Sequence, residues 1–385
     1  MRKLPIILIP GIQGTTLLDS NRPDFKTVWS GIKKFFSDIH RLRLKSNGVS
    51  DEHLESIIER SDVENIAYSE LINYLKDKGY KVFIFGYDWR KSNKDAAIKL
   101  AALVESLKLR YGNTNSFNFI THSMGCLVLS AYLKSLSEEE QDTVVNRAIM
   151  TVPPFLGSME STMNLTIGSS LLFNSSDDFR KVARTFPAVY ELLPVYKDAY
   201  SFSNQQSAAQ FNSYKFDTYW QQVDDVNRDD TQDKHDLMHD RLKQLGKLRD
   251  QNNLVFDFSA QSKSLRDKCV IISGIGSDTR HTTKVLENHG HYKFFFEFEE
   301  KPDQDGDGTV PAISAHVFKG KVTTISVEKS IFESWMDSRI IGRGDQHAFF
   351  LNNGRVQNII TRFLKGDTER DNWFKSAGKG VDIVT

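Results

Sequence analysis

The fold is decided by the stretch Phe117-Asn118-Phe119-Ile120-Thr121-His122-Ser123-Met124-Gly125-Cys126-Leu127-Val128-Leu129. Residues 117–120 form a short apolar run that is typical of a strand buried in a parallel sheet, and the residues after Gly125 favour a helix. A serine in the tight turn between such a strand and such a helix is the context of a nucleophile elbow. The helix N-terminus points at the oxyanion that develops during attack. Ser123 is therefore the candidate nucleophile, and the Met124 amide is a candidate oxyanion donor.

Patterns of buried strands continue on both sides of this turn. Apolar runs predict strands at 4–9, 82–85, 148–152, 269–272 and 322–327, and the earlier strands alternate with helical patterns at 71–78, 94–111 and 126–136. This alternation is typical of α/β proteins with a mostly parallel sheet and helices on both faces. We predict that residues 1–157 begin the sheet core, that residues 158–265 form a helical cap insertion, and that residues 266–385 complete the core and end in a polar tail.

The composition argues against several classes of protein. Lys plus Arg equals Asp plus Glu at 50 each, so no net charge favours nucleic acid as a partner. The two cysteines, Cys126 and Cys269, are too few for a disulfide framework or a four-cysteine zinc site. The apolar run at 4–9 is too short for a signal peptide, and no window approaches the length of a membrane-spanning helix. We expect a soluble, cytoplasmic protein that binds no nucleic acid.

The loop Pro10-Gly11-Ile12-Gln13-Gly14 follows the first predicted strand. In hydrolases with a nucleophile elbow, the loop after an early strand supplies a second amide to the oxyanion hole. The glycines allow the backbone to approach a tetrahedral intermediate closely, and the Ile12 amide is the candidate donor. A phosphate-binding loop is disfavoured because no Gly-Lys-Ser/Thr sequence follows.

A serine nucleophile needs a base and an orienting carboxylate, in the chain order serine, acid, histidine. The acid is expected in the carboxylate-rich loop 303–309, where Asp307 lies closer than Asp305 to the next element. This loop also resembles an EF-hand at its first six positions. Its twelfth position is Ser314 instead of glutamate, so we expect neither calcium nor another metal there.

Among the ten histidines, His347 has the position that the last triad member needs, after the strand 322–327 and before an apolar helix start. His122 adjoins the candidate nucleophile, but neighbouring side chains in a tight turn point apart, so it is not expected to serve Ser123 as base. His235 and His239 have the spacing of metal ligands on a helix. They stand among Asp, Lys and Arg residues, which favours a solvated helix face.

Together these residues resemble the lecithin:cholesterol acyltransferase-like family, which includes lysosomal phospholipase A2-type enzymes and bacterial relatives. The matching segments recur in family order: Ile9-Pro10-Gly11 with Gly14, Val28-Trp29, Tyr87-Asp88-Trp89-Arg90, His122-Ser123-Met124-Gly125, Pro154-Phe155-Leu156-Gly157, Gly306-Asp307-Gly308-Thr309-Val310 and His347. Two departures are Thr121, where the family usually has glycine, and the lack of counterparts to the disulfides of secreted animal members.

The resemblance implies an α/β-hydrolase fold and a catalytic triad of Ser123, Asp307 and His347. It favours Asp307 over Asp305 as the acid, and it assigns the oxyanion hole to the amides of Ile12 and Met124. It also implies an activity without a cofactor, in which a lipid acyl ester is cleaved through an acyl-serine. The acyl group would pass to water, as in a phospholipase, or to another hydroxyl, as in an O-acyltransferase.

Residues 26–45, within a possible insertion at about 20–65, combine basic residues with an apolar and aromatic stripe at helical spacing. A basic amphipathic helix of this kind lies at anionic membrane surfaces, with lipid as its partner. The candidate membrane contacts, expected to face solvent in the free protein, are Trp29, Lys33, Lys34, Phe35 and Phe36. The alternative is a helix whose aromatic stripe packs on the domain.

Three functions stay open on the sequence. The first is a serine-dependent lipid acyl hydrolase or acyltransferase, with peripheral membrane association. The second is a soluble carboxylesterase or thioesterase for small acyl esters, in which the aromatic stripe is merely packed. The third is a non-catalytic binding scaffold, which the presence of all three triad residue types in the required order disfavours.

Overall fold

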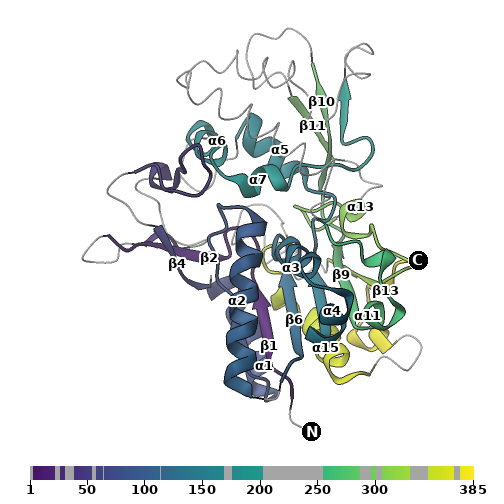
Figure 1. Ribbon diagram of the computed structural model, residues 1–385. Helices are drawn as coiled ribbons and strands as arrows, with labels where there is room; N and C mark the ends of the chain where they lie inside the picture. Colours follow the sequence, from purple (N-terminus) through teal and green to yellow (C-terminus); the bar gives the residue numbers. More distant parts are fainter. Residues whose placement is uncertain are drawn as a thin grey trace.

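The computed structural model describes residues 3–21, 27–30, 39–53, 58–63, 65–112, 114–168, 176–202, 255–286, 296–300, 306–329, 346–367 and 373–385. The described residues form a central seven-stranded sheet in the order β13-β12-β9-β7-β6-β1-β5 (Figure 1). The strands are β1 (Ile6–Ile9), β5 (Val82–Ile84), β6 (Phe117–His122), β7 (Val145–Thr151), β9 (Cys269–Ile275), β12 (Thr323–Glu328) and β13 (Val381–Ile383). All neighbours pair in parallel except β12 and β13. The predicted α/β fold with a mostly parallel sheet is confirmed.

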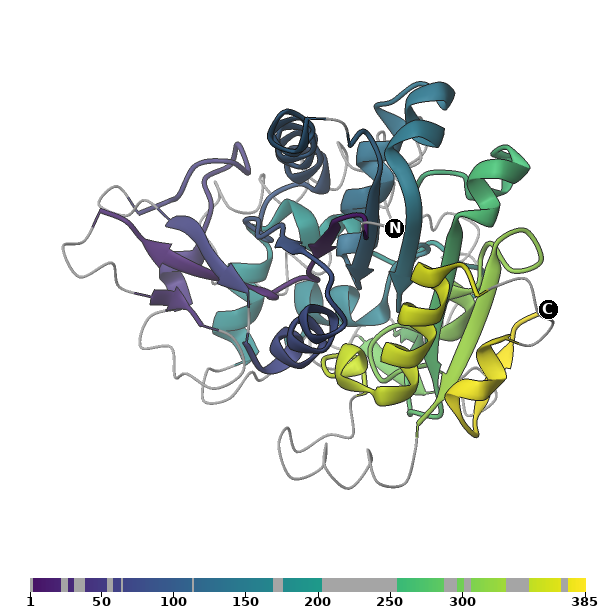
Figure 2. The same cartoon turned by 90° about the horizontal axis from the view of Figure 1, so that it is seen from below.

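Apolar side chains on both faces explain why the central strands are largely apolar in sequence, with β1 as an unbroken run. Successive side chains of a strand point to opposite faces, so Ile7 joins the core on one face and Ile6 the core on the other. The helices α2 (Asn93–Tyr111) and α3 (Gly125–Lys134) pack into the first core. The helices α1 (Asn65–Asp77) and α15 (Gly354–Lys365) pack into the second, so the sheet lies between two helical layers (Figure 2).

A second group of elements lies beyond the carboxyl ends of the central strands, at the top of Figure 1. It contains α5 (Met159–Thr166), α6 (Ser176–Ala183), α7 (Pro187–Glu191) and a sheet in the order β11-β10-β8. Only β8 (Tyr200–Phe202) comes from residues 158–265, because β10 (Arg280–Val285) and β11 (Phe296–Glu300) follow later in the chain. The polar sequence of β10 carries no buried-strand pattern, which is why this sheet was not expected.

The predicted helix over 26–45 is wrong at its start, since β3 (Thr27–Trp29) is a strand in a sheet with β2 (Thr15–Asp19) and β4 (Ile58–Val63). Trp29 is only 2% exposed, its ring packs at 68° on Trp89 with 5.0 Å between centroids, and its Nε1–H donates to the Gln13 carbonyl. The expectation that Trp29 faces solvent is therefore also wrong, because the indole finds both packing and a hydrogen-bond acceptor inside. The other candidate contacts, Lys33, Lys34, Phe35 and Phe36, lie outside the described residues, as do His235 and His239.

The remaining described elements are short. They are η1 (Ile39–Leu42), α4 (Glu138–Val144), η2 (Phe258–Ala260), α11 (Lys263–Asp267), α13 (Ala312–Ala315), η3 (Phe350–Asn352) and η4 (Trp373–Ala377). No helix in the described ranges combines the length and the apolar character that crossing a bilayer requires. Cys126 and Cys269 are both buried and carry free thiols.

Candidate active site

Ser123 occupies the sharp turn between β6 and α3. Its φ of 53° lies in the left-handed region, a conformation that costs a non-glycine residue about 1–3 kcal/mol and is common at functional sites. A Cβ on Gly125 would stand 2.5 Å from the carbonyl oxygen of Ile9, so strand, turn and helix pass each other without room for a side chain at this position. Thr121 is accommodated in the interior, with Oγ1 3.0 Å from the Cys126 sulfur. The close approach of β1 to this turn therefore requires glycine at position 125, whereas position 121 has room for the threonine side chain.

Three residues that are distant in the chain form one hydrogen-bonded series. His347 Nε2 lies 2.8 Å from Ser123 Oγ, and His347 Nδ1 lies 2.6 Å from Asp307 Oδ2. The side chains are largely enclosed, since Ser123 is 5%, Asp307 1% and His347 7% exposed. This is the geometry in which a histidine takes the proton of a serine while a carboxylate holds its other nitrogen. The expected contact between Asp307 and His347 is present, and Asp305 lies outside the described residues.

The loop around Asp307 directs one carboxylate oxygen to the histidine. Oδ1 accepts hydrogen bonds from the amides of Thr309 at 3.0 Å and Val310 at 2.7 Å. The Gly308 amide donates to Thr279 Oγ1, and the His347 amide donates to the Asp307 carbonyl at 3.1 Å. Because Oδ1 is occupied by the loop's own amides, Oδ2 is the oxygen left for His347 Nδ1–H.

The loop after β1 lies directly against the turn of Ser123. A Cβ on Gly11 would stand 2.8 Å from Ser123 Cβ, so only glycine permits this approach. Within the described ranges, the amides of Ile12 and Met124 donate no hydrogen bond. Two uncommitted N–H groups beside a nucleophile are what an oxyanion hole requires.

His122 is next to Ser123 in sequence, but its ring nitrogens are engaged elsewhere. Nδ1 lies 2.8 Å from Tyr68 Oη, and Nε2 lies 3.0 Å from the carbonyl oxygen of His347. Burial, with the nearby charge of His347, lowers the pKa of His122 to about 3. His122 is therefore neutral at ordinary pH and, as expected, is not placed to act as base for Ser123.

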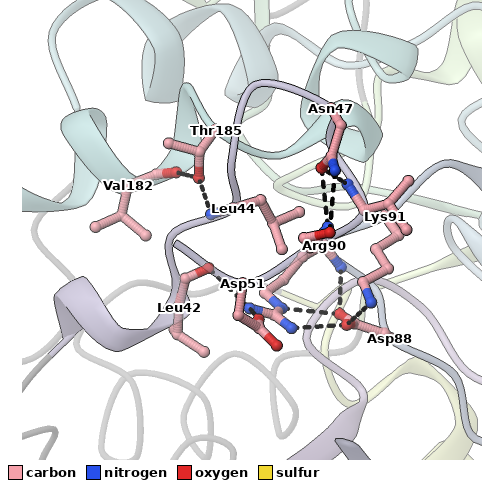
Figure 3. Close-up of polar contacts among 11 residues, drawn as sticks. Leu42, Leu44, Asn47, Asp51, Asp88, Arg90, Lys91, Val182 and Thr185 are labelled. Atoms are coloured by element: carbon pink, nitrogen blue, oxygen red, sulfur yellow. Dashed lines mark hydrogen bonds and ion pairs between the residues drawn. The ribbon is translucent and has the colours of Figure 1, made fainter. Parts of the chain in front are cut away.

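The Tyr87-Asp88-Trp89-Arg90 segment holds the surroundings of the site together. The Arg90 guanidinium is fully buried and grips Asp88 through two bonds, Nε to Oδ1 at 2.9 Å and Nη2 to Oδ2 at 2.7 Å (Figure 3). Its Nη1 donates to Asp51 Oδ1 at 2.8 Å and to the Leu42 carbonyl at 2.9 Å. Burial by itself raises the pKa of Asp88, but the charge and hydrogen bonds of Arg90 outweigh it, so the pKa is lowered.

The other two residues of this segment reach toward the loop after β1. Tyr87 Oη donates to the Pro10 carbonyl at 2.9 Å, and Trp89 Nε1–H donates to the Thr15 carbonyl at 2.9 Å. The segment therefore supports the candidate oxyanion loop through its backbone carbonyls. This agrees with the expectation that Asp88, Trp89 and Arg90 are structural residues near the site.

The elements at the carboxyl ends of the strands are attached to this framework. Ser158 Oγ, at the start of α5, donates to the Thr309 carbonyl at 2.6 Å. Glu191, at the end of α7, is 1% exposed, and its carboxylate accepts from Ser92 Oγ and from the amide and side chain of Asn93. Burial raises the pKa of Glu191 despite these hydrogen bonds. Thus α5 is tied to the loop that carries Asp307, and α7 is tied to the start of α2.

Tyr68 is a residue near the site that the sequence did not single out. It lies on α1, is 2% exposed, and its Oη accepts a hydrogen bond from the Gly11 amide at 2.9 Å. Nothing in the local sequence of α1 marks this tyrosine, because its partners come from other parts of the chain.

Known proteins resemble this chain in family and in fold. The lecithin:cholesterol acyltransferase family model matches residues 42–319, well over half of the chain. A chain of the Tle4–Tli4 complex shares the fold, with a TM-score of 0.62 and 14% sequence identity over 94% of this chain and 98% of that chain. The mature lipase BlEst2 of Bacillus licheniformis is more distant, with a TM-score of 0.35 and 13% identity over 85% of this chain and 84% of its own. No curated protein matches the chain.

Proposed function

The chain belongs to the lecithin:cholesterol acyltransferase family, which supports an enzyme of the acyl-ester hydrolase type, and from this premise we propose that it is a serine-dependent lipid acyl hydrolase or O-acyltransferase. The observation that carries the proposal is the series from Ser123 Oγ through His347 to Asp307, with distances of 2.8 Å and 2.6 Å. A non-catalytic scaffold has no need of a serine held in the left-handed region and hydrogen-bonded to a histidine–carboxylate pair.

In the proposed acylation step, Ser123 Oγ attacks the acyl carbonyl carbon while its proton passes to His347 Nε2. The carbonyl electron pair moves to the oxygen, which the amides of Ile12 and Met124 stabilise. Asp307 Oδ2 keeps the other proton of the ring on Nδ1 and stabilises the imidazolium. The bond to the alcohol leaving group then breaks, the carbonyl re-forms, and His347 gives its proton to the departing oxygen.

In the proposed deacylation step, His347 removes a proton from water or from a second alcohol, whose oxygen attacks the acyl-serine. The carbonyl of the new acid or ester re-forms as Ser123 Oγ leaves and takes the proton back. The same residues therefore serve a phospholipase and an O-acyltransferase, and the two differ only in the acceptor. Neither step requires a cofactor.

The proposed substrate is a lipid acyl ester, and residues 158–265 are proposed to be a cap over the acyl pocket. Support for the cap comes from α5 and α7, which attach to the Asp307 loop and to α2 on the side where Ser123 lies. Peripheral membrane contact is proposed for Lys33, Lys34, Phe35 and Phe36, without Trp29. Two buried free thiols fit the proposed cytoplasmic location.

A soluble carboxylesterase or thioesterase for small acyl esters is the second candidate. It is favoured by the inward packing at both described ends of the 26–45 segment, where Trp29 is 2%, Ile39 3% and Leu42 1% exposed. Apolar groups that are already buried in the free protein add no area to a membrane contact.

Incubation with vesicles of labelled anionic phospholipid, with and without a long-chain alcohol, separates these candidates. We expect release of a labelled fatty acid, or a labelled ester when the alcohol is present, and no product from Ser123→Ala. A Lys33→Glu and Lys34→Glu double variant should lose vesicle hydrolysis but keep activity on a short soluble ester. Cleavage of the soluble ester alone favours the second candidate, and cleavage of neither substrate refutes the proposed function.

A further inference from the structure

Three hydrogen bonds join the loop after β1 to the backbone of His347. The Gly11 amide donates to Tyr68 Oη at 2.9 Å, Tyr68 Oη lies 2.8 Å from His122 Nδ1, and His122 Nε2 lies 3.0 Å from the His347 carbonyl oxygen. The first residue belongs to the candidate oxyanion loop, and the last is the histidine beside Ser123. The series therefore connects the candidate oxyanion loop to the residue that carries the candidate base.

The chemistry of these groups allows one direction of donation. A carbonyl oxygen only accepts, so His122 Nε2 must carry a proton. A neutral imidazole has one N–H, so Nδ1 is bare and accepts from the Tyr68 hydroxyl, whose oxygen in turn accepts from the Gly11 amide. A proton on Nδ1 would leave the Tyr68 hydroxyl hydrogen without this acceptor. Burial, with the charge of His347, keeps His122 neutral by lowering its pKa to about 3.

The residues of this hydrogen-bonded series are buried and closely packed. Tyr68 is 2% and His122 5% exposed, and their rings meet at 76° with centroids 5.6 Å apart. A Cβ on Gly14 would stand 2.7 Å from Tyr68 Oη, so glycine at that position leaves room for the phenol. The ring of His122 also lies against that of His347, with 5.2 Å between centroids. Displacing Tyr68 or His122 would therefore be transmitted directly to the loop and to the base.

We propose that Tyr68 and His122 are positioning residues that hold the oxyanion loop and the His347 backbone in register on either side of Ser123. This inference rests on the proposed function, since it assigns to both residues a part in the same reaction. Neither residue touches the reacting atoms. Their effect is on geometry, where a misplacement of about 1 Å lowers the rate by as much as about 10²-fold.

The test compares kcat and KM on a short soluble ester for Tyr68→Phe, His122→Leu and the double variant. Each single change should lower kcat by about 10- to 100-fold and leave KM unchanged, because the interactions affected act on the transition state. The double variant should fall little below the worse single variant, because either change already interrupts the series. His122→Gln should recover part of the lost kcat, since its side-chain amide can again donate toward the His347 carbonyl.

Thr324→Val is the control. It also removes a buried side-chain hydroxyl, which donates to the Val322 carbonyl at 3.0 Å at the start of β12, outside the site and the proposed cap. Its kcat should stay within about twofold of wild type, with thermal unfolding reporting the comparable loss of a hydrogen bond. The proposal is overturned if folded Tyr68→Phe and His122→Leu keep their kcat, if their effects multiply in the double variant, or if the control loses as much.

A readout that needs no substrate separates the series from the proposed function. Nitrogen-15 spectra of histidine-labelled protein at neutral pH should show His122 as the neutral form with its proton on Nε2. An imidazolium, or a proton on Nδ1, overturns the series whatever the activity. A wild type that cleaves no ester and is not labelled at Ser123 by a fluorophosphonate contradicts the proposed function instead.

Discussion

Replacing His122 by glutamine should make the free energy of unfolding fall less steeply as the pH is lowered below neutral. The histidine of the unfolded chain takes up a proton near its ordinary pKa of 6.5, whereas burial and the charge of His347 hold the folded pKa at about 3. A depressed folded pKa means that this stability is present above pH 6.5 and is lost as the pH falls toward 3. The slope is about 1.4 kcal/mol per pH unit for one proton, which amounts to about 2–3 kcal/mol between about pH 7 and pH 4.5.

Urea unfolding followed by circular dichroism at several pH values in this range measures the effect. As the pH is lowered, the free energy of unfolding of wild type should fall more steeply than that of His122→Gln. Between about pH 7 and pH 4.5, wild type should lose about 2–3 kcal/mol more than the variant. His316 offers an independent comparison, because burial, with the charge of Lys319, lowers its pKa to about 4. His316→Asn should remove a similar part of the acid sensitivity. Parallel profiles for wild type and His122→Gln would refute the reasoning, since His122 would then titrate alike in the folded and unfolded chains.

Four further outcomes are expected. Ser123→Ala should lower ester turnover by about 10⁴–10⁶-fold and abolish fluorophosphonate labelling without unfolding the chain, whereas unchanged turnover would end the triad assignment. Asp307→Asn should lower kcat by about 10⁴-fold and Asp305→Asn should be mild, and the opposite ranking would move the acid upstream. Gly11→Ala, whose Cβ would meet Ser123 Cβ at 2.8 Å, should lower the labelling rate by about 10²-fold in a folded protein. Arg90→Met should lower the free energy of unfolding by about 3–5 kcal/mol in urea titrations, because it removes the charge and the two hydrogen bonds that Arg90 gives to the buried Asp88 carboxylate, and an unchanged midpoint would contradict this.

The sequence by itself predicted six of the seven strands of the central sheet and the nucleophile turn, but not β13, which lies in the segment expected to be a polar tail. Strands β1 and β6 are buried along their whole length, and the largely apolar sequence of such strands, between turn residues, favours a buried strand. The turn of Ser123 was predictable because strand, serine, glycine and helix follow one another without interruption. Candidates for base and acid followed from chain order, with the family resemblance deciding for Asp307 over its neighbour.

Tertiary structure alone decided the features whose partners are distant in the chain. Strand β10 is largely buried between β8 and β11, but its sequence is polar and has no apolar run that would predict a buried strand. Trp29 belongs to an apolar stripe that is compatible with either a membrane surface or a protein core. In the structure its indole is buried and donates a hydrogen bond to the Gln13 carbonyl. Tyr68 acquires its partners only because the tertiary structure brings α1 against the end of β6 and the loop after β1. A local pattern records which side chains avoid water, but a hydrogen bond between distant segments depends on where the whole chain places its donor and its acceptor.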